Sequence, residues 1–411
     1  MASQEIVVVG GGLAAGKLAA AYREADGEGD LTIVSTEPDP PYNRPPLTKG
    51  LLRGEQERES TYVMEQEEWD DAVVELRLGT TVEALHPEEH EIELEGGERL
   101  GYGTLVVATG ARPRVLSTPG ADLVGVHTYR TLEDAETVSR AAEEAHSALV
   151  IGGSFIGAEV AASLRMKGLD VTLVELGPLL MPQLACPELS AELAELYREQ
   201  GVELLLEAEL EELTGNGKLL TGGRLGDGRT IEAYLAVVGV GVEPNVELAE
   251  AAGATVDNGI VVDEQFRSSL DDVYAVGDVA RYPDTTSGRL RRIEHWSAAS
   301  AQGGHLGRQL AGARQPYDEL PAFFTQLFDT KLQVLGDVEA AAECVLRGSL
   351  AEGRLIGFHL TDKGQLVGAI VHGQSADLVA ELGDLIRQKP TVEDPTRLLD
   401  ENLRPAEAVA G

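Results

Sequence analysis

The sequence is poor in basic residues and has no long apolar run. Its 411 residues carry 33 basic against 70 acidic side chains, which gives a formal net charge of −37 at pH 7. This balance excludes a basic nucleic-acid-binding protein. No segment reaches the roughly 18 consecutive apolar residues that a membrane helix requires. We therefore expect neither a nucleic-acid partner nor a membrane span.

Cysteine is also scarce. Only Cys186 and Cys344 occur, far apart in the sequence and without a neighbouring cysteine. This spacing predicts neither a disulfide framework nor a zinc site, so we expect both cysteines to be inert and no metal to be bound. The apolar run that starts at Ile6 has no basic lead-in, which favours a first strand over a signal peptide. A reducing cytoplasm is the expected location.

The composition that remains is that of a globular protein, with 43% apolar and 25% charged residues. Only seven of the basic residues are lysines. An acid-rich, lysine-poor surface is a solubility device in concentrated salt, but a GC-rich genome gives a similar bias without any adaptation to salt. Both origins remain open.

A glycine-rich turn near the N-terminus follows a short apolar strand and opens a helical stretch. In this pattern Gly10 permits the tight turn, Gly12 lets the backbone approach a pyrophosphate, and Ala15 packs the helix on the strand. Glu37 follows the next apolar strand, at a distance suited to accepting hydrogen bonds from ribose hydroxyls. The segment is typical of a dinucleotide-binding fold.

The same plan returns 142 residues later, with Gly152, Ser154 and Gly157 in the turn. At the close-approach position, Ser154 either displaces the backbone slightly or donates a hydrogen bond to the phosphate. Glu175 follows the next strand, where it would bind a free 2′-hydroxyl and repel a 2′-phosphate, and no arginine accompanies it. This half is predicted to prefer NADH over NADPH.

Two dinucleotide sites in one chain indicate a hydride exchange between a flavin and a nicotinamide cofactor. Further apolar strands end in small residues near 105–110, 236–241 and 273–277, and a hairpin and a helix follow position 317. We predict an α/β protein with two Rossmann-like domains and a C-terminal α+β domain. The expected parts are 1–112 and 240–316 for FAD, 113–239 for NAD, and 317–411 for the tail.

Four segments carry a family resemblance: 41–49, 108–113, 273–280 and 294–296. Together they make the chain similar, over nearly its whole length, to the FAD-dependent, NADH-linked ferredoxin and rubredoxin reductases of oxygenase and P450 systems, which share the glutathione-reductase fold. The resemblance implies a monomer or homodimer that takes hydride from NADH through FAD. It also implies electron transfer to a small iron–sulfur redox protein, a ferredoxin or rubredoxin.

The resemblance also assigns site residues. Lys49 would lie beside the flavin and pair with Glu159, and Phe155 would gate the nicotinamide, while Asp278 would bind the ribitol and Trp296 would lie near the isoalloxazine. The remaining FAD positions would be Gly10, Gly12, Leu13, Ala14, Ala15, Glu37, Arg44, Val82, Ala108, Thr109, Gly110, Arg130, Gly277, Glu294 and His295. The NADH positions would be Gly152, Ser154, Ile156, Gly157, Glu175 and Gly239.

Each assignment has a plainer alternative. Lys49 is otherwise a solvated surface lysine, Glu159 a helix residue paired with an arginine, and Trp296 a core residue. His295 is more simply an ordinary polar contact, because hydride transfer needs no proton shuttle.

Two differences from related proteins qualify the resemblance: a missing redox cysteine and an altered segment at 321–327. Related disulfide reductases carry a redox cysteine where this chain has residues 43–46, and no cysteine precedes Cys186, so electrons are expected to leave the flavin directly. The segment 321–327 lacks the two tryptophans and the acid of the family. The alternatives to a ferredoxin reductase are a monodehydroascorbate or quinone reductase and a redox sensor resembling apoptosis-inducing factor.

Overall fold

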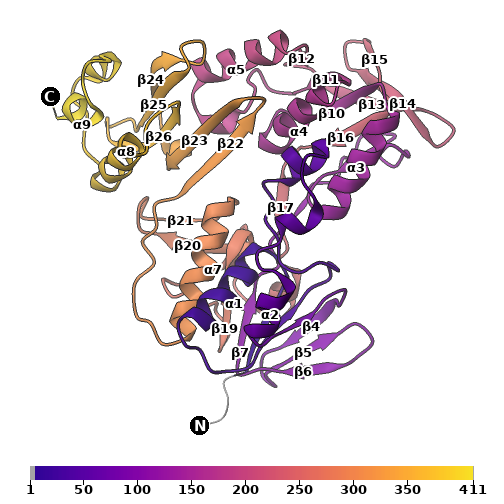
Figure 1. Ribbon diagram of the computed structural model, residues 1–411, viewed down its shortest axis with the longest axis vertical. Helices are drawn as coiled ribbons and strands as arrows, with labels where there is room; N and C mark the ends of the chain where they lie inside the picture. Colours follow the sequence, from indigo (N-terminus) through magenta and orange to yellow (C-terminus); the bar gives the residue numbers. More distant parts are fainter. Residues whose placement is uncertain (1–4, 411) are drawn as a thin grey trace. The chain divides into compact units, whose positions relative to one another are not determined.

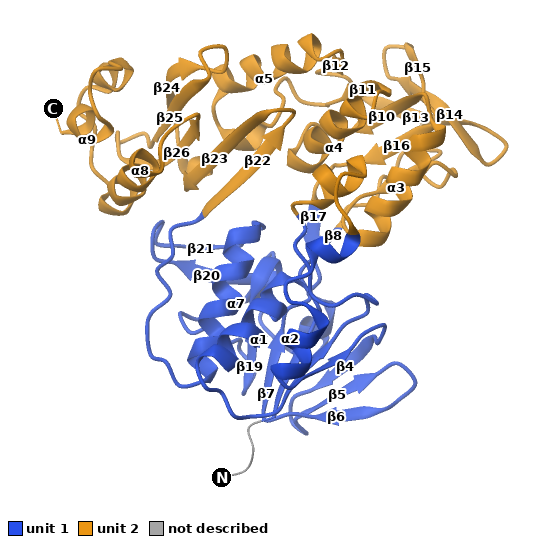
Figure 2. Cartoon of the chain, viewed as in Figure 1, with its two compact units in different colours: residues 1–44, 58–112, 242–321 blue, residues 45–57, 113–241, 322–411 orange. Residues whose placement is uncertain are grey.

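The computed structural model describes residues 5–410 and divides into two compact units. The first unit comprises residues 1–44, 58–112 and 242–321, and the second comprises 45–57, 113–241 and 322–411 (Figure 2). Each unit therefore gathers segments that are distant in the sequence. The two units are described separately below.

A five-stranded parallel sheet forms the centre of the first unit, with the strand order β19-β7-β1-β2-β3. Its strands β7 and β19 are labelled in Figure 1. Every residue of β1, β2 and β7 is buried. Such fully buried and largely apolar strands are typical of a parallel sheet that is covered on both faces. The strands are β1 (Ile6–Val9), β2 (Leu31–Val34), β3 (Val74–Arg77), β7 (Thr104–Val107) and β19 (Val273–Ala275).

Helices α1 (Leu13–Glu24) and α7 (Trp296–Leu310) pack closely against each other in this unit. A Cβ on Gly303 would lie 2.2 Å from the carbonyl oxygen of Ala14, and one on Gly307 would lie 2.3 Å from that of Leu18. Only glycine lets the two backbones approach so closely. The N-terminal end of α1, which follows the first glycine-rich turn, is thereby fixed by α7.

Shorter elements complete the first unit. Two three-stranded sheets have the strand orders β4-β5-β6 and β18-β20-β21. The elements are α2 (Gln66–Asp71), β4 (Val82–His86), β5 (Glu91–Leu94), β6 (Arg99–Gly101), α6 (Glu247–Ala251), β18 (Ile260–Val261), β20 (Ala280–Asp284) and β21 (Arg289–Arg291). Strands β8 (Ala111–Pro113) and β17 (Val242–Pro244) pair with each other.

A second five-stranded parallel sheet lies in the second unit, with the strand order β12-β11-β10-β16-β9. Its strand β16 is fully apolar and buried, β10 is apolar and buried except for Ser147, and the glycine-rich turn after β10 opens α4 as the sequence predicts. The elements of this part are β9 (Val126–Thr128), α3 (Leu132–Glu144), β10 (Ser147–Ile151), α4 (Phe155–Met166), β11 (Asp170–Val174), α5 (Pro187–Glu199), β12 (Glu203–Leu205) and β16 (Leu235–Val238). A three-stranded sheet of β13 (Leu210–Asn216), β14 (Leu219–Leu225) and β15 (Thr230–Glu232) accompanies it.

The C-terminal part of the second unit is an antiparallel sheet with the order β22-β23-β26-β25-β24. Its strands are β22 (Ala322–Leu327), β23 (Thr330–Gly336), β24 (Glu343–Ser349), β25 (Arg354–Leu360) and β26 (Leu366–His372), followed by α8 (Ala376–Gln388) and α9 (Pro405–Val409). Strands β25 and β26 form the hairpin and α8 is the helix that the sequence predicts after position 317. The α/β architecture expected from the sequence is thus confirmed.

The expectation that the two cysteines are unpaired is wrong. Cys186, at the N-cap of α5, and Cys344, in β24, form a disulfide with their Cα atoms 5.3 Å apart. They are 158 residues apart in the sequence, so no local spacing pattern predicts that they form a pair. His359 lies opposite Cys344 in the antiparallel pair of β24 and β25, and its side chain is fully buried.

Two further properties concern residues 5–410 as described. None of their helices combines the length with the apolar character that a membrane span needs. These residues also contain no group of three or more His, Cys, Asp or Glu side chains arranged to hold a metal ion.

Candidate functional site

The first glycine-rich turn leaves its backbone open where a ligand would approach. Gly10 has φ +111°, and a Cβ there would lie 2.3 Å from the carbonyl oxygen of Ala108, so this turn requires glycine. At Gly12, the N-cap of α1, a Cβ would meet no atom within 4 Å. The open space lies at a helix N-terminus, where unpaired amide groups favour an anion. The turn therefore fits a pyrophosphate group.

The ribose-binding candidate Glu37 has partners from the chain itself. Its Oε1 accepts a hydrogen bond from Arg44 at 3.0 Å and its Oε2 accepts one from the Tyr42 hydroxyl at 2.5 Å. The Arg44 guanidinium also lies over the Tyr42 ring, 4.9 Å from its centroid. A carboxylate has about four acceptor positions, so Glu37 keeps capacity for a ribose hydroxyl while Arg44 fixes its orientation. Tyr42 lies inside the motif at 41–49 but was not singled out from the sequence.

The turn after β7 contains three predicted site residues, Ala108, Thr109 and Gly110. Thr109 donates its hydroxyl to the carbonyl of Asn245 at 2.7 Å, and the Asn245 amide donates back to the carbonyl of Thr109 at 2.8 Å. A Cβ on Gly110, which has φ +66°, would meet no atom within 4 Å. Asn245 thus fixes the turn, and it was missed because it lies 136 residues further along the chain.

Gly277 and Asp278 follow β19 in a short 3-10 turn. The amide of Gly277 donates to the side chain of Gln302 at 2.8 Å, and Gln302 is fully buried in α7. The carbonyl of Asp278 accepts from Arg292 at 3.2 Å. The predicted ribitol-binding turn is therefore held by α7 and by Arg292, and Gln302 is a second residue that the sequence analysis missed.

Trp296 begins α7 and is not a core residue, because 40% of its surface is exposed. Its indole Nε1 donates to the side chain of Asn43 at 2.8 Å, which orients the ring. The alternative that Trp296 is only packing is therefore wrong. Burial lowers the pKa of the neighbouring His295 to about 4, although the Asp278 carboxylate acts in the opposite direction, so this imidazole is neutral at pH 7. Glu294 is exposed and pairs with Arg292.

The other predicted flavin-site positions are scattered over both units. Leu13, Ala14 and Ala15 form the buried first turn of α1, and Val82 begins β4. Arg130 belongs to the second unit, where its backbone N–H donates to Asp134 beside the N-terminus of α3. The three α1 residues therefore lie together in the first unit, and Arg130 belongs to the second unit.

The second glycine-rich turn is packed more tightly than the first. A Cβ on Gly157 would lie 1.9 Å from the carbonyl oxygen of Gly152, and one on Gly152 would lie 2.5 Å from that of Gly239. The three predicted glycines thus meet at one point, where β10, α4 and the end of β16 converge. This contact requires glycine at each position and holds the start of α4 against the sheet.

Ser154 is the N-cap of α4, and its hydroxyl has a partner within the chain. Its hydroxyl donates to the carbonyl of Gly239 at 2.7 Å. A hydroxyl has one hydrogen to donate, so it is not available for a phosphate at the same time. Ser154 therefore ties the turn to the end of β16.

Glu175 is held in a defined position at the end of β11. Its Oε2 accepts from the amide of Gly153 at 2.6 Å, and its Oε1 accepts from the amide of Gly177 at 2.7 Å. Hydrogen bonds from amides stabilise the charged form of a carboxylate. The negative charge that would discriminate between the two nicotinamide cofactors is thus fixed beside the second glycine-rich turn.

Helix α4 carries two of the predicted catalytic residues on its first turns. Phe155 begins the helix and packs edge-on against Phe323 of β22, with the ring centroids 5.1 Å apart. Ile156 follows it at a partly buried position. Glu159, one helical turn beyond Phe155, is only 8% exposed. The same helix therefore begins at the glycine-rich turn and presents both Phe155 and Glu159.

The predicted pair of Lys49 and Glu159 is present. Lys49 Nζ lies 2.6 Å from Glu159 Oε2, and both side chains are about nine-tenths buried, with 12% and 10% exposed. The ammonium also donates to the carbonyl of Pro45 and to the hydroxyl of Thr48, both at 3.2 Å. Both the surface-lysine and the arginine-pair alternatives are therefore wrong. Lys49 occupies a non-helical position, φ −125° and ψ −112°, inside the helical turn Leu47–Leu51.

Glu159 receives three further donors, so its charge is fully compensated. Thr48 donates to Oε2 at 2.6 Å, Thr325 of β22 donates to Oε1 at 2.8 Å, and the amide of Gln326 donates to Oε1 at 3.3 Å. A buried carboxylate needs such a set, because its desolvation is costly. Thr48 was visible in the motif at 41–49, but Thr325 is 166 residues from Glu159 and no sequence pattern linked them.

Two buried tyrosines near the pair stay neutral. Burial raises the pKa of Tyr129 well above its ordinary value, and the charges of Asp134 and Glu159 add to the effect. Burial does the same for the pKa of Tyr197, where Glu159 again contributes. The Tyr129 hydroxyl donates to the carbonyl of Leu47 at 2.5 Å, which anchors the segment that carries Lys49.

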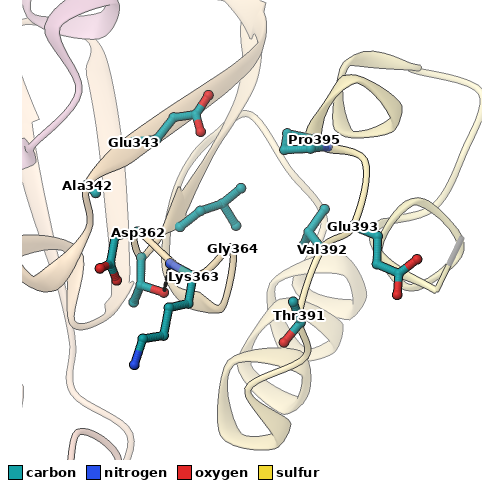
Figure 3. A pocket seen from close by; sticks show the side chains of 11 residues that line it. Ala342, Glu343, Asp362, Lys363, Gly364, Thr391, Val392, Glu393 and Pro395 are labelled. Carbon is teal, nitrogen blue, oxygen red and sulfur yellow. Dashed lines mark hydrogen bonds between the residues drawn. The ribbon is translucent and has the colours of Figure 1, made fainter.

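A hollow of about 770 Å³ lies on the C-terminal sheet of the second unit. Figure 3 shows that it is bordered by the ends of β24 and β25 and by the segment after α8. Its charged side chains, Glu343, Asp362, Lys363 and Glu393, are exposed to solvent. No sequence-predicted site residue lines it, so we do not assign it to the candidate site.

The fold and its turns define a class: a protein with two dinucleotide-binding Rossmann-like folds, the second of which carries a buried lysine–glutamate pair beside its nucleotide turn. Residues 4–303 match the model of the pyridine nucleotide-disulphide oxidoreductase family, and the chain belongs to this family.

Known proteins resemble the chain over most of its length. It is 37% identical to rhodocoxin reductase of Rhodococcus erythropolis, over 85% of this chain and 82% of that protein. It is 35% identical to the ferredoxin–NAD(+) reductase component of the anthranilate 1,2-dioxygenase system of Burkholderia cepacia, over 92% and 93%. The crystal structure of the covalent putidaredoxin reductase–putidaredoxin complex superposes with a TM-score of 0.93 at 31% identity, over 99% of both chains.

Proposed function

We propose that this protein is an NADH-dependent FAD reductase that passes electrons to a small iron–sulfur protein, a ferredoxin or rubredoxin. Its relatives are named for that activity, rhodocoxin reductase and a ferredoxin–NAD(+) reductase component among them. The observation that carries the proposal is that α4 joins the second glycine-rich turn, Phe155 and the buried pair of Glu159 with Lys49.

The two glycine-rich turns suit two different nucleotides. The open backbone at Gly12 and the Glu37–Arg44 pair would hold the pyrophosphate and ribose of FAD, with Asp278 and Trp296 toward the ribitol and the ring. The turn of residues 152–157 with Glu175 would hold NADH. When bound, FAD would supply hydride acceptance from NADH and the release of electrons one at a time. The segments 1–112 and 240–316 would form the FAD domain, 113–239 the NAD domain and 317–411 the C-terminal domain.

The protein's own residues have defined roles in this reaction. The Lys49 ammonium, fixed by Glu159, Thr48 and Pro45, would place a positive charge where negative charge develops on the reduced flavin. The Glu175 carboxylate favours NADH because a 2′-phosphate would meet its negative charge. Phe155 would move to admit the nicotinamide.

Anaerobic stopped-flow mixing of the FAD-loaded protein with NADH, and separately with NADPH, tests the proposal. We expect fast flavin bleaching with NADH, much slower bleaching with NADPH, and prompt reoxidation by an oxidised ferredoxin or ferricyanide. Slow conversion to a long-lived species with a long-wavelength charge-transfer band would instead indicate a redox sensor. Reoxidation by a quinone or monodehydroascorbate but not by ferredoxin would assign a different acceptor, and failure to bind FAD would overturn the proposal.

A further inference from the structure

Strand β22 contacts the first turns of α4 through two side chains in matching register. Phe323 and Thr325 are two residues apart and share one face of the strand, while Phe155 and Glu159 are four residues apart and share one face of the helix. Phe323 meets Phe155, and Thr325 meets Glu159. Two residues of a strand and four residues of a helix both span about 6 Å, so the two contacts form together.

The two oxygens of Glu159 have divided partners. Oε2 faces Lys49 and Thr48, and both residues come from the segment 45–57. Among residues 5–410, the hydrogen-bond donors to Oε1 come from β22 alone, the Thr325 hydroxyl and the amide of Gln326. The Thr325 bond is the shorter of the two, at 2.8 Å against 3.3 Å, and Thr325 is 1% exposed. The orientation of the carboxylate toward Lys49 therefore depends on a strand of the C-terminal sheet.

We propose that Thr325 is a positioning residue for the redox chemistry: its hydroxyl holds Glu159 so that the other carboxylate oxygen fixes the Lys49 ammonium. The inference rests on the proposed function, in which Lys49 stabilises the reduced flavin. Without the hydroxyl, Oε1 keeps only the longer bond from Gln326, and the carboxylate can rotate away from the lysine. The C-terminal sheet thereby contributes to the site through hydrogen bonding as well as through packing.

Three variants separate a hydroxyl role from a packing role. Thr325→Val keeps the shape and removes the hydroxyl, whereas Thr325→Ser keeps the hydroxyl and removes a methyl group. Thr330→Val, at the start of β23, applies the same change to the next strand at a residue that is not among the hydrogen-bond partners of Glu159. Thermal unfolding of each variant establishes that it is folded before the functional measurements.

The first measurement is the anaerobic reduction of the FAD-loaded protein by NADH, together with the flavin midpoint potential. Thr325→Val should lower the limiting reduction rate about tenfold, the factor that corresponds to the loss of one charge-assisted hydrogen bond. It should also make the midpoint potential more negative, with the NADH dissociation constant nearly unchanged. Thr325→Ser and Thr330→Val should behave as the wild type does.

The second measurement does not depend on turnover. The seven lysines of the chain can be followed separately by peptide mass spectrometry after brief treatment with an amine-specific reagent. In the apoprotein, Lys49 should be labelled faster in Thr325→Val than in the wild type, while the other six lysines keep their rates.

The outcomes distinguish this inference from the proposed function. If the wild type is not reduced by NADH, the proposed function fails, and the labelling result still decides whether Thr325 orders the pair. If the wild type is reduced normally but Thr325→Val matches it in rate, potential and labelling, the positioning role is refuted. If Thr325→Ser is impaired and Thr325→Val is not, the residue acts by packing, and the inference is also refuted.

Discussion

The disulfide between Cys186 and Cys344 should contribute a large share of the stability of the second unit. It closes a loop across 158 positions, from the start of α5 to β24. A cross-link stabilises a fold mainly by restricting the unfolded chain, and a loop of this length corresponds to about 5 kcal/mol. Reduction should therefore lower the melting temperature by about 6 °C if the whole chain unfolds together, or by about 10 °C if only the second unit does.

Differential scanning calorimetry with and without a phosphine reductant measures this effect. The matched control is the double variant Cys186→Ser, Cys344→Ser, which has no thiol and should not respond to the reductant. Its melting temperature should be close to that of the reduced wild type. Two free thiols titrated in the unreduced protein, or an equal response of the wild type and the double variant, would refute the reasoning.

Three further predictions concern charged groups. Glu175→Ala should raise the ratio of kcat/KM for NADPH to kcat/KM for NADH about tenfold, because it removes roughly 1.4 kcal/mol of repulsion with a 2′-phosphate. An unchanged ratio in steady-state assays of flavin reduction would contradict the proposed role of this carboxylate. Lys49→Met should lower the free energy of unfolding by about 3 kcal/mol, because Glu159 then stays buried without its partner. Adding Glu159→Leu should recover part of this loss. Urea titrations in which the double variant is less stable than both the wild type and Lys49→Met would contradict this explanation. Burial lowers the pKa of His359, so its own contribution to the free energy of unfolding should fall as the pH drops below 6.5, by at most about 1.4 kcal/mol per pH unit. A His359→Asn variant should therefore lose less stability than the wild type over this range, and an equal pH dependence of the two proteins in urea titrations would exclude this histidine as a cause.

Local patterns in the sequence predicted the two nucleotide-binding folds. Glycines at fixed offsets between an apolar strand and a helix act through the backbone of their own turn, so Gly10, Gly12, Gly152 and Gly157 could be interpreted without the tertiary structure. The apolar strands and the hairpin of the C-terminal sheet were predictable for the same reason, because their periodicity is a property of a few adjacent residues. The pairing of Lys49 with Glu159 came from a family resemblance, since 110 residues separate them and no spacing rule spans that distance.

Only the tertiary structure decided which residues from distant strands and helices become hydrogen-bond partners of the predicted site residues. Thr325 at Glu159, Gln302 at Gly277 and Asn245 at Thr109 are each ordinary polar residues in their own segment, and they acquire a role only when another element is packed against them. The disulfide follows the same rule, because two isolated cysteines carry no local signal and become a bridge only when α5 and β24 meet. The sequence by itself thus determined the glycine-rich turns and the apolar strands, because both depend on residues that are adjacent in the chain. The folded chain decided which buried charges and thiols find a partner, because those contacts depend on elements that meet only in three dimensions.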